Sequence, residues 1–300
     1  MSALLRVRPD VQRALDAGKP VVALESSVLA QGLPIPHNRE AARRMVQAVE
    51  RAGAKAAITG VVRGVPSFGL TADDLERFLA QTGVRKVSAR DIPITVQQKR
   101  DGATTVAASL AIAKAAGALV FATGGIGGVH RGAPVDESAD LAELANTPMV
   151  VVCAGAKSIL DLGATTERLE TLGVPVIGFR TDEFPGFFTA ETGIVLDARV
   201  ASAAEVGELF RVQRELGRRQ AVLVVQPPPV EHALAHGVVE AAVDQAMTDA
   251  ERERIRGAAL TPFLLSAVAR ITGGGSLVAN MELLEQNAGL AGEIAVALSQ

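Results

Sequence analysis

Residues 149–161, Met-Val-Val-Val-Cys-Ala-Gly-Ala-Lys-Ser-Ile-Leu-Asp, join an apolar run to a helical pattern. The run 149–153 is short and rich in β-branched residues, which is typical of a buried strand. A turn of small residues that carries Lys157 follows, and a helix is predicted over 159–171. A buried strand that leads through a tight turn into a helix is the repeating unit of a parallel α/β sheet.

The same unit recurs along the 300 residues of the chain. Further strands are predicted at 21–24, 57–62, 86–88, 119–122, 174–179 and 221–225. Further helices are predicted at 38–52, 72–81, 104–116, 139–145, 203–216, 238–256, 261–271 and 277–299. Residues 63–70 indicate a turn or short hairpin, whose second strand would be antiparallel. We therefore predict a single domain over 1–300, of the α/β class, with layered α/β/α architecture and a largely parallel, mixed central sheet.

Composition narrows the classes of partner. The formal net charge is −3, there is no Trp or Tyr, and no long basic run occurs, which argues against a nucleic-acid-binding face. The N-terminus lacks the features of a signal peptide, and the longest apolar stretch, near 111–120, is interrupted by Lys114. We expect a cytoplasmic protein that acts on a small molecule, with no nucleic-acid or membrane partner. The single cysteine, Cys153, is expected to be a small buried residue.

Unusual polar residues follow the predicted strands, and ligands of open α/β sheets bind beyond the carboxyl ends of strands. Lys157 is expected in a poorly solvated cleft at a helix N-terminus, with Ser158 as the cap. A neutral amine there can attack an aldehyde-level carbon and form an imine. A phosphate-binding or surface lysine is the alternative.

Two more charged residues lie at predicted strands. Glu25 directly follows the strand 21–24, and a partly desolvated carboxyl group there suits a general acid. A surface or helix-capping carboxylate is the alternative. Lys86 lies in a short predicted strand, where a cation can hold a phosphate, although an ordinary solvated lysine is also compatible with the pattern.

Two segments have the composition of anion-binding loops. Residues 121–132, Phe-Ala-Thr-Gly-Gly-Ile-Gly-Gly-Val-His-Arg-Gly, hold five glycines, which allow close backbone approach to a ligand and a nest of amides. Their spacing is neither the dinucleotide nor the Walker pattern. Residues 101–106 are expected to be a loop that enters a helix, whose N-terminus either binds an anion or is simply capped.

The remaining candidate site residues have carboxylate or amide side chains. Residues 136–140, Asp-Glu-Ser-Ala-Asp, fit either the acidic first turn of an amphipathic helix or a site for a hard cation. Asn280 and Asn287 are seven residues apart, which places both amides on one face of a helix. Such amides read a base edge or are ordinary satisfied polar residues.

These motifs resemble those of a known family. The segments 22–27 (Val-Ala-Leu-Glu-Ser-Ser), 31–34 (Gln-Gly-Leu-Pro), 102–108 (Gly-Ala-Thr-Thr-Val-Ala-Ala), 121–132 and 152–161 (Val-Cys-Ala-Gly-Ala-Lys-Ser-Ile-Leu-Asp) strongly resemble the pseudouridine-5′-phosphate glycosidases, also called the indigoidine synthase A-like family. Segments 261–265 (Thr-Pro-Phe-Leu-Leu) and 275–280 (Gly-Ser-Leu-Val-Ala-Asn) resemble its C-terminal motifs. The likeness runs in order from about residue 20 to near the C-terminus.

The resemblance implies reversible cleavage of the C–C glycosidic bond of pseudouridine 5′-phosphate to uracil and ribose 5-phosphate. It implies that Lys157 is the nucleophile on ribose C1′, forming an imine with the ring-opened sugar, and that Glu25 is the proton donor to uracil C5. By the same resemblance, the other site residues are substrate contacts at Lys86, Val106, Ser138, Ala139 and Asp140, a Mn²⁺ ligand at Asp136, and supporting pocket residues at Thr123, His130 and Asn280. Asp136 and Asp140 are close enough for these two roles to be exchanged. A homotrimer is also implied.

Other functions stay open, and the family pattern is not matched everywhere. A non-catalytic sugar-phosphate sensor would bind ribose 5-phosphate without turnover, and an imine-forming lyase would act on another sugar phosphate. Ser27 stands where threonine is usual, and Glu137 where an apolar residue is expected. Gln226, with three prolines after it, replaces an Asn-Pro pattern, which is expected to alter a contact to uracil or to a neighbouring subunit.

Overall fold

The apolar runs form the strands of one large sheet in the computed structural model, which describes residues 4–132 and 136–300. Its strands are β1 (Arg6–Val7), β2 (Val21–Leu24), β3 (Lys55–Val62), β4 (Val65–Phe68), β5 (Arg85–Val87), β6 (Gly102–Thr104), β7 (Val120–Ala122), β9 (Val150–Cys153), β11 (Val176–Phe179), β12 (Arg199–Val200) and β13 (Val222–Val225). A separate antiparallel pair is formed by β8 (Val129–His130) and β10 (Leu160–Asp161).

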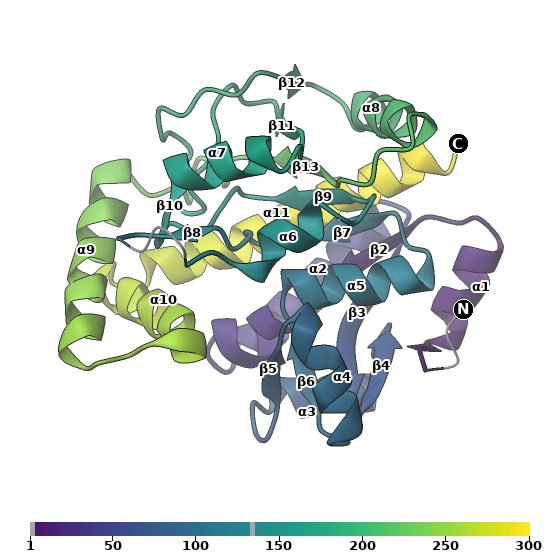
Figure 1. Ribbon diagram of the computed structural model, residues 1–300, viewed down its shortest axis with the longest axis horizontal. Helices are drawn as coiled ribbons and strands as arrows, with labels where there is room; N and C mark the ends of the chain where they lie inside the picture. Colours follow the sequence, from purple (N-terminus) through teal and green to yellow (C-terminus); the bar gives the residue numbers. More distant parts are fainter. Residues whose placement is uncertain (1–3, 133–135) are drawn as a thin grey trace.

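The helices alternate with these strands along the chain (Figure 1). They are α1 (Pro9–Asp16), α2 (His37–Arg51), α3 (Ala72–Leu79), α4 (Ile92–Gln97), α5 (Val106–Ala116), α6 (Ala139–Leu144), α7 (Leu162–Thr171), α8 (Ala203–Glu215), α9 (His236–Arg252), α10 (Leu260–Ile271) and α11 (Gly275–Leu298). The short helices α1 and α4 were not predicted from the sequence, because their eight and six residues are fewer than the window over which a helical period is judged.

The sheet is mixed and mostly parallel, as predicted. Parallel strands follow the order β3-β2-β7-β9-β13-β11-β12. Both β4 and β6 run antiparallel to β3, and the β3–β4 pair is the hairpin predicted at 63–70. This order places the carboxyl ends of β2, β7 and β9 side by side, since Leu24 pairs with Ala122 and Ala122 with Val152.

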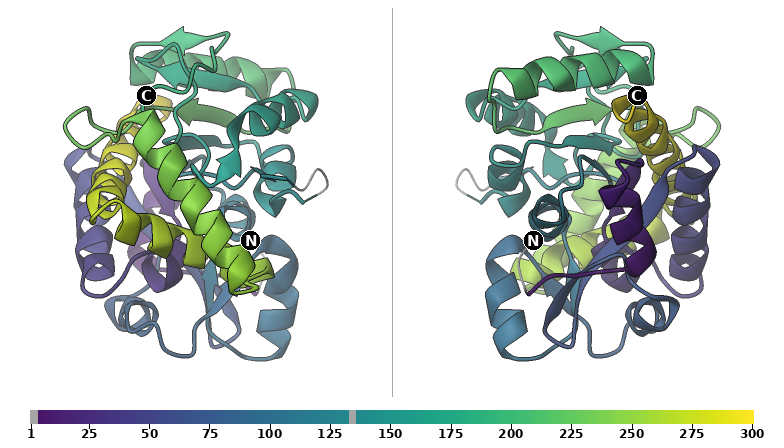
Figure 2. Two further views of the ribbon diagram at one scale, coloured as in Figure 1. Left: turned by 90° about the vertical axis from the view of Figure 1, so that its left-hand side faces the viewer. Right: turned by 90° about the vertical axis from the view of Figure 1, so that its right-hand side faces the viewer.

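Helices cover both faces of the sheet, which explains why its central strands lack polar alternation. Every residue of β2, β9 and β13 is buried. The helices α2 and α11 lie against one face, and α5 and α6 against the other (Figure 1). The side view in Figure 2 shows α9 running across the end of the molecule, next to α10.

Two helices begin later than predicted. Thr104 belongs to β6, and α5 starts at Val106 after the cap Thr105. Residues 160–161 pair with β8, so α7 starts at Leu162, where the Asp161 side chain accepts a hydrogen bond of 2.9 Å from the Ala164 amide. The prediction that Ser158 caps a helix is therefore wrong, because strand pairing separates Lys157 from the helix.

Two further predictions bear on location and reactivity. Among the described residues, no single helix has the length and apolar composition to cross a bilayer, although α10 and α11 taken together do and meet at a bend of 117°. Cys153 is fully buried, as predicted, and burial raises the pKa of its thiol to about 12. A thiol with this pKa carries almost no thiolate at neutral pH.

Candidate active site

The carboxyl ends of three adjacent parallel strands carry the central residues of the candidate site. Glu25 follows β2, Thr123 follows β7, and Lys157 lies four residues after the end of β9. Because these strands are neighbours in the sheet, side chains far apart in the sequence meet at one edge. This is the arrangement that the sequence predicted for Glu25 and Lys157.

Glu25 is 4% exposed and accepts two hydrogen bonds from hydroxyl groups. Ser27 Oγ donates to Oε2 over 2.6 Å, and Thr123 Oγ1 donates to Oε1. A hydroxyl group both donates and accepts, so either partner can turn to accept when the carboxyl group is protonated. Glu25 can therefore change its protonation state without leaving an oxygen unpaired. The substituted Ser27 keeps the hydroxyl that this contact needs.

Two adjoining pockets share the side chains of Glu25, Lys86 and Lys157. The smaller pocket has a volume of about 480 Å³ and also contains Phe187 and Asn280 in its wall. The larger has a volume of about 1350 Å³ and is lined mostly by polar residues. Together they form one cleft in which a planar group and an anionic group can bind on either side of the shared residues.

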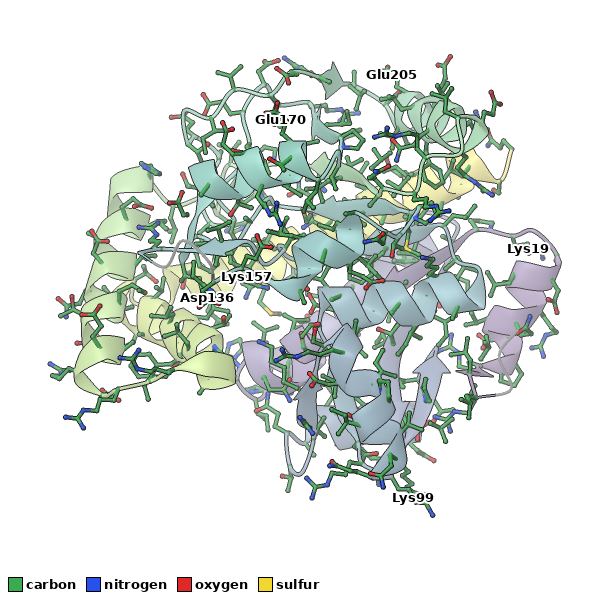
Figure 3. All side chains as sticks on the ribbon, viewed as in Figure 1. Lys19, Lys99, Asp136, Lys157, Glu170 and Glu205 are labelled. Atoms are coloured by element: carbon green, nitrogen blue, oxygen red, sulfur yellow. The ribbon has the colours of Figure 1, made fainter. Side chains whose placement is uncertain are left out.

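The larger pocket contains all but two of the predicted site residues beyond Glu25 and Lys157. Its wall includes the predicted positions Lys86, Val106, His130, Asp136, Ser138, Ala139 and Asp140. Figure 3 shows Asp136 and Lys157 on the side of the sheet that faces α9 and α10. Asn280 lies in the smaller pocket instead, and Thr123 reaches the site through its bond to Glu25.

Lys86 is mostly buried in this cleft. Burial and the nearby Lys157 ammonium lower the pKa of Lys86, and the opposite charges of Asp140 and Glu25 only partly offset this. Two lysines that repel each other in a poorly solvated cleft are stabilised by a dianion between them. Lys86 therefore lies where an anion is favoured, and its contact with a phosphate stays a prediction.

The N-terminus of α5 adds anion-binding groups to the larger pocket. Thr105 and Val106 line the pocket, and the Val106 amide, at the first position of the helix, has no acceptor within it. Helix N-termini favour anions through such amides.

Arg90 and Ser88 also line this pocket, and neither was singled out as a site residue from the sequence. Their only signal was proximity to Lys86 in the chain.

Asp136 and Asp140 differ sharply in their surroundings. The Asp140 side chain is buried, and its two oxygens accept hydrogen bonds from the amides of Ala107, over 2.9 Å, and Gly127, over 2.8 Å. The Asp136 side chain is 61% exposed, with Oδ2 at 3.0 Å from His130 Nδ1. Asp140 thus joins the glycine-rich segment to α5, whereas the Asp136 side chain is largely exposed to a ligand and has His130 beside one of its oxygens.

The fit of a Mn²⁺ ion to these groups follows from their number and chemistry. Within residues 4–132 and 136–300, no three His, Cys, Asp or Glu side chains converge as a metal site. The His130 Nδ1 atom is buried, and its 3.0 Å contact with Asp136 Oδ2 lacks the geometry of a hydrogen bond. Carboxylate and water ligands suit Mn²⁺, and hard cations are often held by one or two carboxylates together with substrate phosphates. Asp136 fits an ion held in that way.

The smaller pocket contains two amide oxygens without a partner. Asn280 is 5% exposed and its Oδ1 accepts no hydrogen bond in the described part of the chain. Gln31 Nε2 donates to the Val84 carbonyl over 3.2 Å, which leaves its buried Oε1 atom unpaired in the same pocket. Unpaired buried oxygens are costly, so both favour a ligand that donates hydrogen bonds.

Phe187 forms part of the same wall and was also missed by the sequence analysis. Its backbone has a φ of 65°, in the left-handed region that non-glycine residues rarely adopt. Gly125 packs directly against the ring, since a Cβ atom there would lie 2.6 Å from Phe187 Cδ2. Gln31 lies in a single π-helical turn, Val28–Gly32, and Phe187 lies outside the helices and strands, so no periodic pattern could have indicated them.

Asn287 and Gln226 lie behind the pocket. Asn287 Nδ2 donates to the Thr123 carbonyl over 2.8 Å, and Gln226 Nε2 donates to Asn287 Oδ1 over 2.9 Å. Gln226 is buried and is not among the residues that line either pocket. The expectation that Gln226 alters a contact to uracil is therefore not supported by its position, because the side chain braces the segment that holds Thr123.

Comparisons with known proteins identify the family of the chain. A family model described as indigoidine synthase A like protein matches residues 10–297. A pseudouridine-5′-phosphate glycosidase of Gemmatimonas aurantiaca is 58% identical over 293 residues, covering 98% of this chain and 96% of that protein. The glycosidase of Escherichia coli K12 is 47% identical, over 97% of this chain and 95% of its own.

Two solved structures share the fold. The prealnumycin C-glycosynthase AlnA, in complex with ribulose 5-phosphate, has a TM-score of 0.92 and 39% sequence identity, and the match covers 100% of this chain and 98% of that chain. An indigoidine synthase A-like protein of Thermotoga maritima has a TM-score of 0.91 and 37% identity, covering 99% and 97%. The chain therefore belongs to the indigoidine synthase A-like family.

Proposed function

We propose that this protein is an enzyme that reversibly cleaves the C–C glycosidic bond of pseudouridine 5′-phosphate, giving uracil and ribose 5-phosphate. The observation that carries the proposal is the position of Glu25, Lys86 and Lys157 in the wall shared by the two pockets. High identity to glycosidases of this name over nearly the whole chain supports the same substrate.

The reaction needs an acid and an electron donor, because a carbon leaving group has no oxygen to protonate. In the proposed step, the Lys157 amine attacks ribose C1′ while the C1′–O4′ bond breaks, and O4′ takes up the proton that the nitrogen releases, which opens the sugar ring. The nitrogen lone pair then forms the C=N bond while the C1′–C5 bond breaks, and its electron pair goes to uracil C5. Glu25 supplies the proton to C5. Water hydrolyses the imine, which releases ribose 5-phosphate and restores the amine.

The two pockets divide the substrate between them in this proposal. Uracil binds in the smaller pocket, where Phe187 covers a face of the ring and the oxygens of Asn280 and Gln31 accept its N–H groups. The sugar phosphate binds in the larger pocket against Lys86 and the Val106 amide. Ser138, Ala139 and Asp140 line the same pocket, as do the supporting residues His130 and Asp136.

We further propose that Asp136, rather than Asp140, holds Mn²⁺. The amide contacts of Asp140 support this choice, since a metal there would compete with two hydrogen bonds. A bound cation would supply positive charge that offsets the phosphate. The family resemblance also implies the homotrimer, which we propose as the assembly.

The test is turnover of pseudouridine 5′-phosphate by the purified protein with Mn²⁺, followed as release of uracil. Glu25→Gln and Lys157→Ala are expected to lower the rate by about 100-fold or more, since each removes a group that acts in the bond-breaking step. Borohydride reduction with ribose 5-phosphate should add one reduced sugar phosphate to Lys157, detected by peptide mass. A folded wild-type protein that releases no uracil would overturn the proposal.

The same measurements separate the alternative functions. A sugar-phosphate sensor would bind ribose 5-phosphate without turnover and without a borohydride adduct. An imine-forming lyase on another sugar phosphate would give the Lys157 adduct but no uracil. Labelling of Lys86 instead of Lys157 would reassign the nucleophile.

A further inference from the structure

Arg131, at the end of the glycine-rich segment, has an unusual set of partners outside the proposed substrate contacts. It directly follows β8 and is not among the described residues that line the two pockets of the cleft. Its side chain is only 25% exposed. Its contacts therefore indicate a role within the protein rather than on the substrate.

The guanidinium group binds the backbone immediately after Lys157. Nη2 donates to the Ser158 carbonyl over 2.8 Å, and Nε donates to the Leu160 carbonyl over 3.1 Å. On the other side, the Lys157 amide donates to the Ile126 carbonyl over 3.1 Å. The segment 157–160 is thus held by the glycine-rich segment at both ends.

The same guanidinium group pairs with α9. Nη1 and Nη2 donate to the two carboxylate oxygens of Glu240 over 2.9 and 2.8 Å, and Asp244 Oδ1 lies 3.7 Å from Nη1. The pair raises the pKa of Arg131 and lowers the pKa of Glu240, chiefly through these hydrogen bonds. A planar fork suits this bidentate geometry, which the point charge of a lysine cannot reproduce.

The partner helix leads to the other wall of the cleft. The helix α9 packs against α10, and Thr261, Pro262 and Leu265 of α10 line the smaller pocket. Arg131 therefore joins the segment that carries Lys157 to the helical pair that closes the side proposed for uracil. A shift in either part changes the position of the amine relative to the ring.

We propose that Arg131 is a positioning residue, which fixes the Lys157 backbone for attack on the sugar carbon, and that Glu240 holds Arg131 in that position. The inference rests on the proposed imine chemistry of Lys157. Misplacement of a reacting group by about 1 Å can cost about 100-fold in rate. Loss of the Arg131 contacts should therefore lower the rate of imine formation more than it weakens binding of the sugar phosphate.

The experiment measures borohydride trapping of ribose 5-phosphate at Lys157, as a rate at saturation and as a half-saturating concentration, over a range of pH. The variants are R131K, E240Q and the double variant. R39K is the matched control, because Arg39 makes a two-bond pair with Glu76 that does not touch residues 157–160. Circular dichroism and melting temperature report folding.

R131K is expected to lower the saturated trapping rate by about 10- to 100-fold, with little change in half-saturation. The pH midpoint should not move, since the positive charge stays. E240Q should have a smaller effect on the trapping rate. The double variant should match R131K, because both changes remove the same set of contacts. R39K should trap at the wild-type rate.

Three results would overturn the inference while the proposed function stands. Folded R131K could trap at the wild-type rate, or the losses in the double variant could be additive. A change confined to half-saturation would also overturn it, because it would make Arg131 a binding residue. Absence of any adduct in the wild-type protein would instead contradict the imine chemistry itself.

Discussion

At the scale of single residues, the site contains buried oxygen atoms of two kinds: some accept hydrogen bonds within the protein, and others do not. Both Glu25 oxygens accept hydroxyl bonds, and both Asp140 oxygens accept amide bonds. By contrast, the buried oxygens of Gln31 and Asn280 have no partner in the described part of the chain. Since buried polar groups are rarely left unpaired, the latter two are where a ligand is expected to contribute hydrogen bonds.

The lowered pKa of Lys86 gives a pH-dependent prediction. Burial and the Lys157 charge lower this pKa, so the Lys86 cation is lost at a lower pH than for an ordinary lysine. Affinity for an anion should therefore fall as pH rises through that lowered pKa. Lys86→Arg keeps its charge and should retain affinity further into the alkaline range.

Calorimetric titration with ribitol 5-phosphate between about pH 7 and pH 10 measures this difference, because ribitol 5-phosphate has no carbonyl group and forms no imine. Above about pH 7 the phosphate is largely a dianion, so its own titration contributes little. Parallel loss of affinity in the wild-type protein and Lys86→Arg would contradict a role for Lys86 in holding the phosphate.

Asp136 and Asp140 should separate in their effects on metal binding and stability. Asp140→Asn turns an amide hydrogen toward one of two backbone donors and should lower the free energy of unfolding by about 1–3 kcal/mol. Asp136→Asn should change it by less than about 0.5 kcal/mol, because the side chain is largely exposed, yet should weaken Mn²⁺ binding.

Urea denaturation measures the stabilities, and the electron paramagnetic resonance signal of free Mn²⁺ measures binding. Equal loss of Mn²⁺ affinity in a folded Asp140→Asn variant would show that the two roles are exchanged.

At the scale of elements, the turn after β9 decides where Lys157 lies. Gly155 has a φ of 78°, and a Cβ atom there would lie 1.9 Å from the Pro185 carbonyl oxygen. The turn is thus pressed against another segment, and it continues into β10 rather than directly into α7. The antiparallel pairing of β10 with β8 places the end of the glycine-rich segment beside the segment that carries the lysine.

Gly155→Ala and Gly117→Ala form a matched pair for this turn. Gly117 has a similar φ of 85°, but nothing lies within 4 Å of its added Cβ. Gly117→Ala should lower the free energy of unfolding by about 1 kcal/mol, from backbone strain alone. Gly155→Ala adds a clash with backbone and should cost more than about 3 kcal/mol. Equal losses in the two variants, measured by urea denaturation, would mean that the turn moves away from the added methyl group without loss of stability.

At the scale of the whole molecule, strand order assembles the site. The order β2-β7-β9 brings Glu25, Thr123 and Lys157 to one edge, and α10 closes the smaller pocket from the far end of the chain. Large side chains of α9 to α11, including Val238, Ile271 and Val278, are at least 37% exposed in the single chain. Exposed apolar side chains that are scattered singly are ordinary on a protein surface, so the homotrimer stays a prediction.

The proposed homotrimer is tested by light scattering coupled to size-exclusion chromatography. We expect a mass three times that of one chain across a wide range of protein concentration. A monomer or dimer at every concentration would contradict the trimer, without affecting the chemistry proposed within one chain.

The sequence by itself determined the fold class, most strands and the candidates at strand ends. Uninterrupted apolar runs identify strands that are buried on both faces of the sheet. Polar residues directly after such strands lie at the carboxyl edge of the sheet, where ligands bind. Glu25 and Lys157 were predicted on this ground, Lys86 was predicted from its place in a short strand, and family motifs supplied their proposed roles.

Only the tertiary structure decided which residues share the cleft and what each is bonded to. Gln31, Phe187 and the Arg131–Glu240 pair depend on contacts between segments far apart in the chain, which local pattern does not encode. Ser158 illustrates the limit: its sequence position suggested a helix cap, but pairing of residues 160–161 with β8 moved the helix start to Leu162. Long-range pairing overrode local propensity there, because a strand partner satisfies the same backbone groups that a helix would.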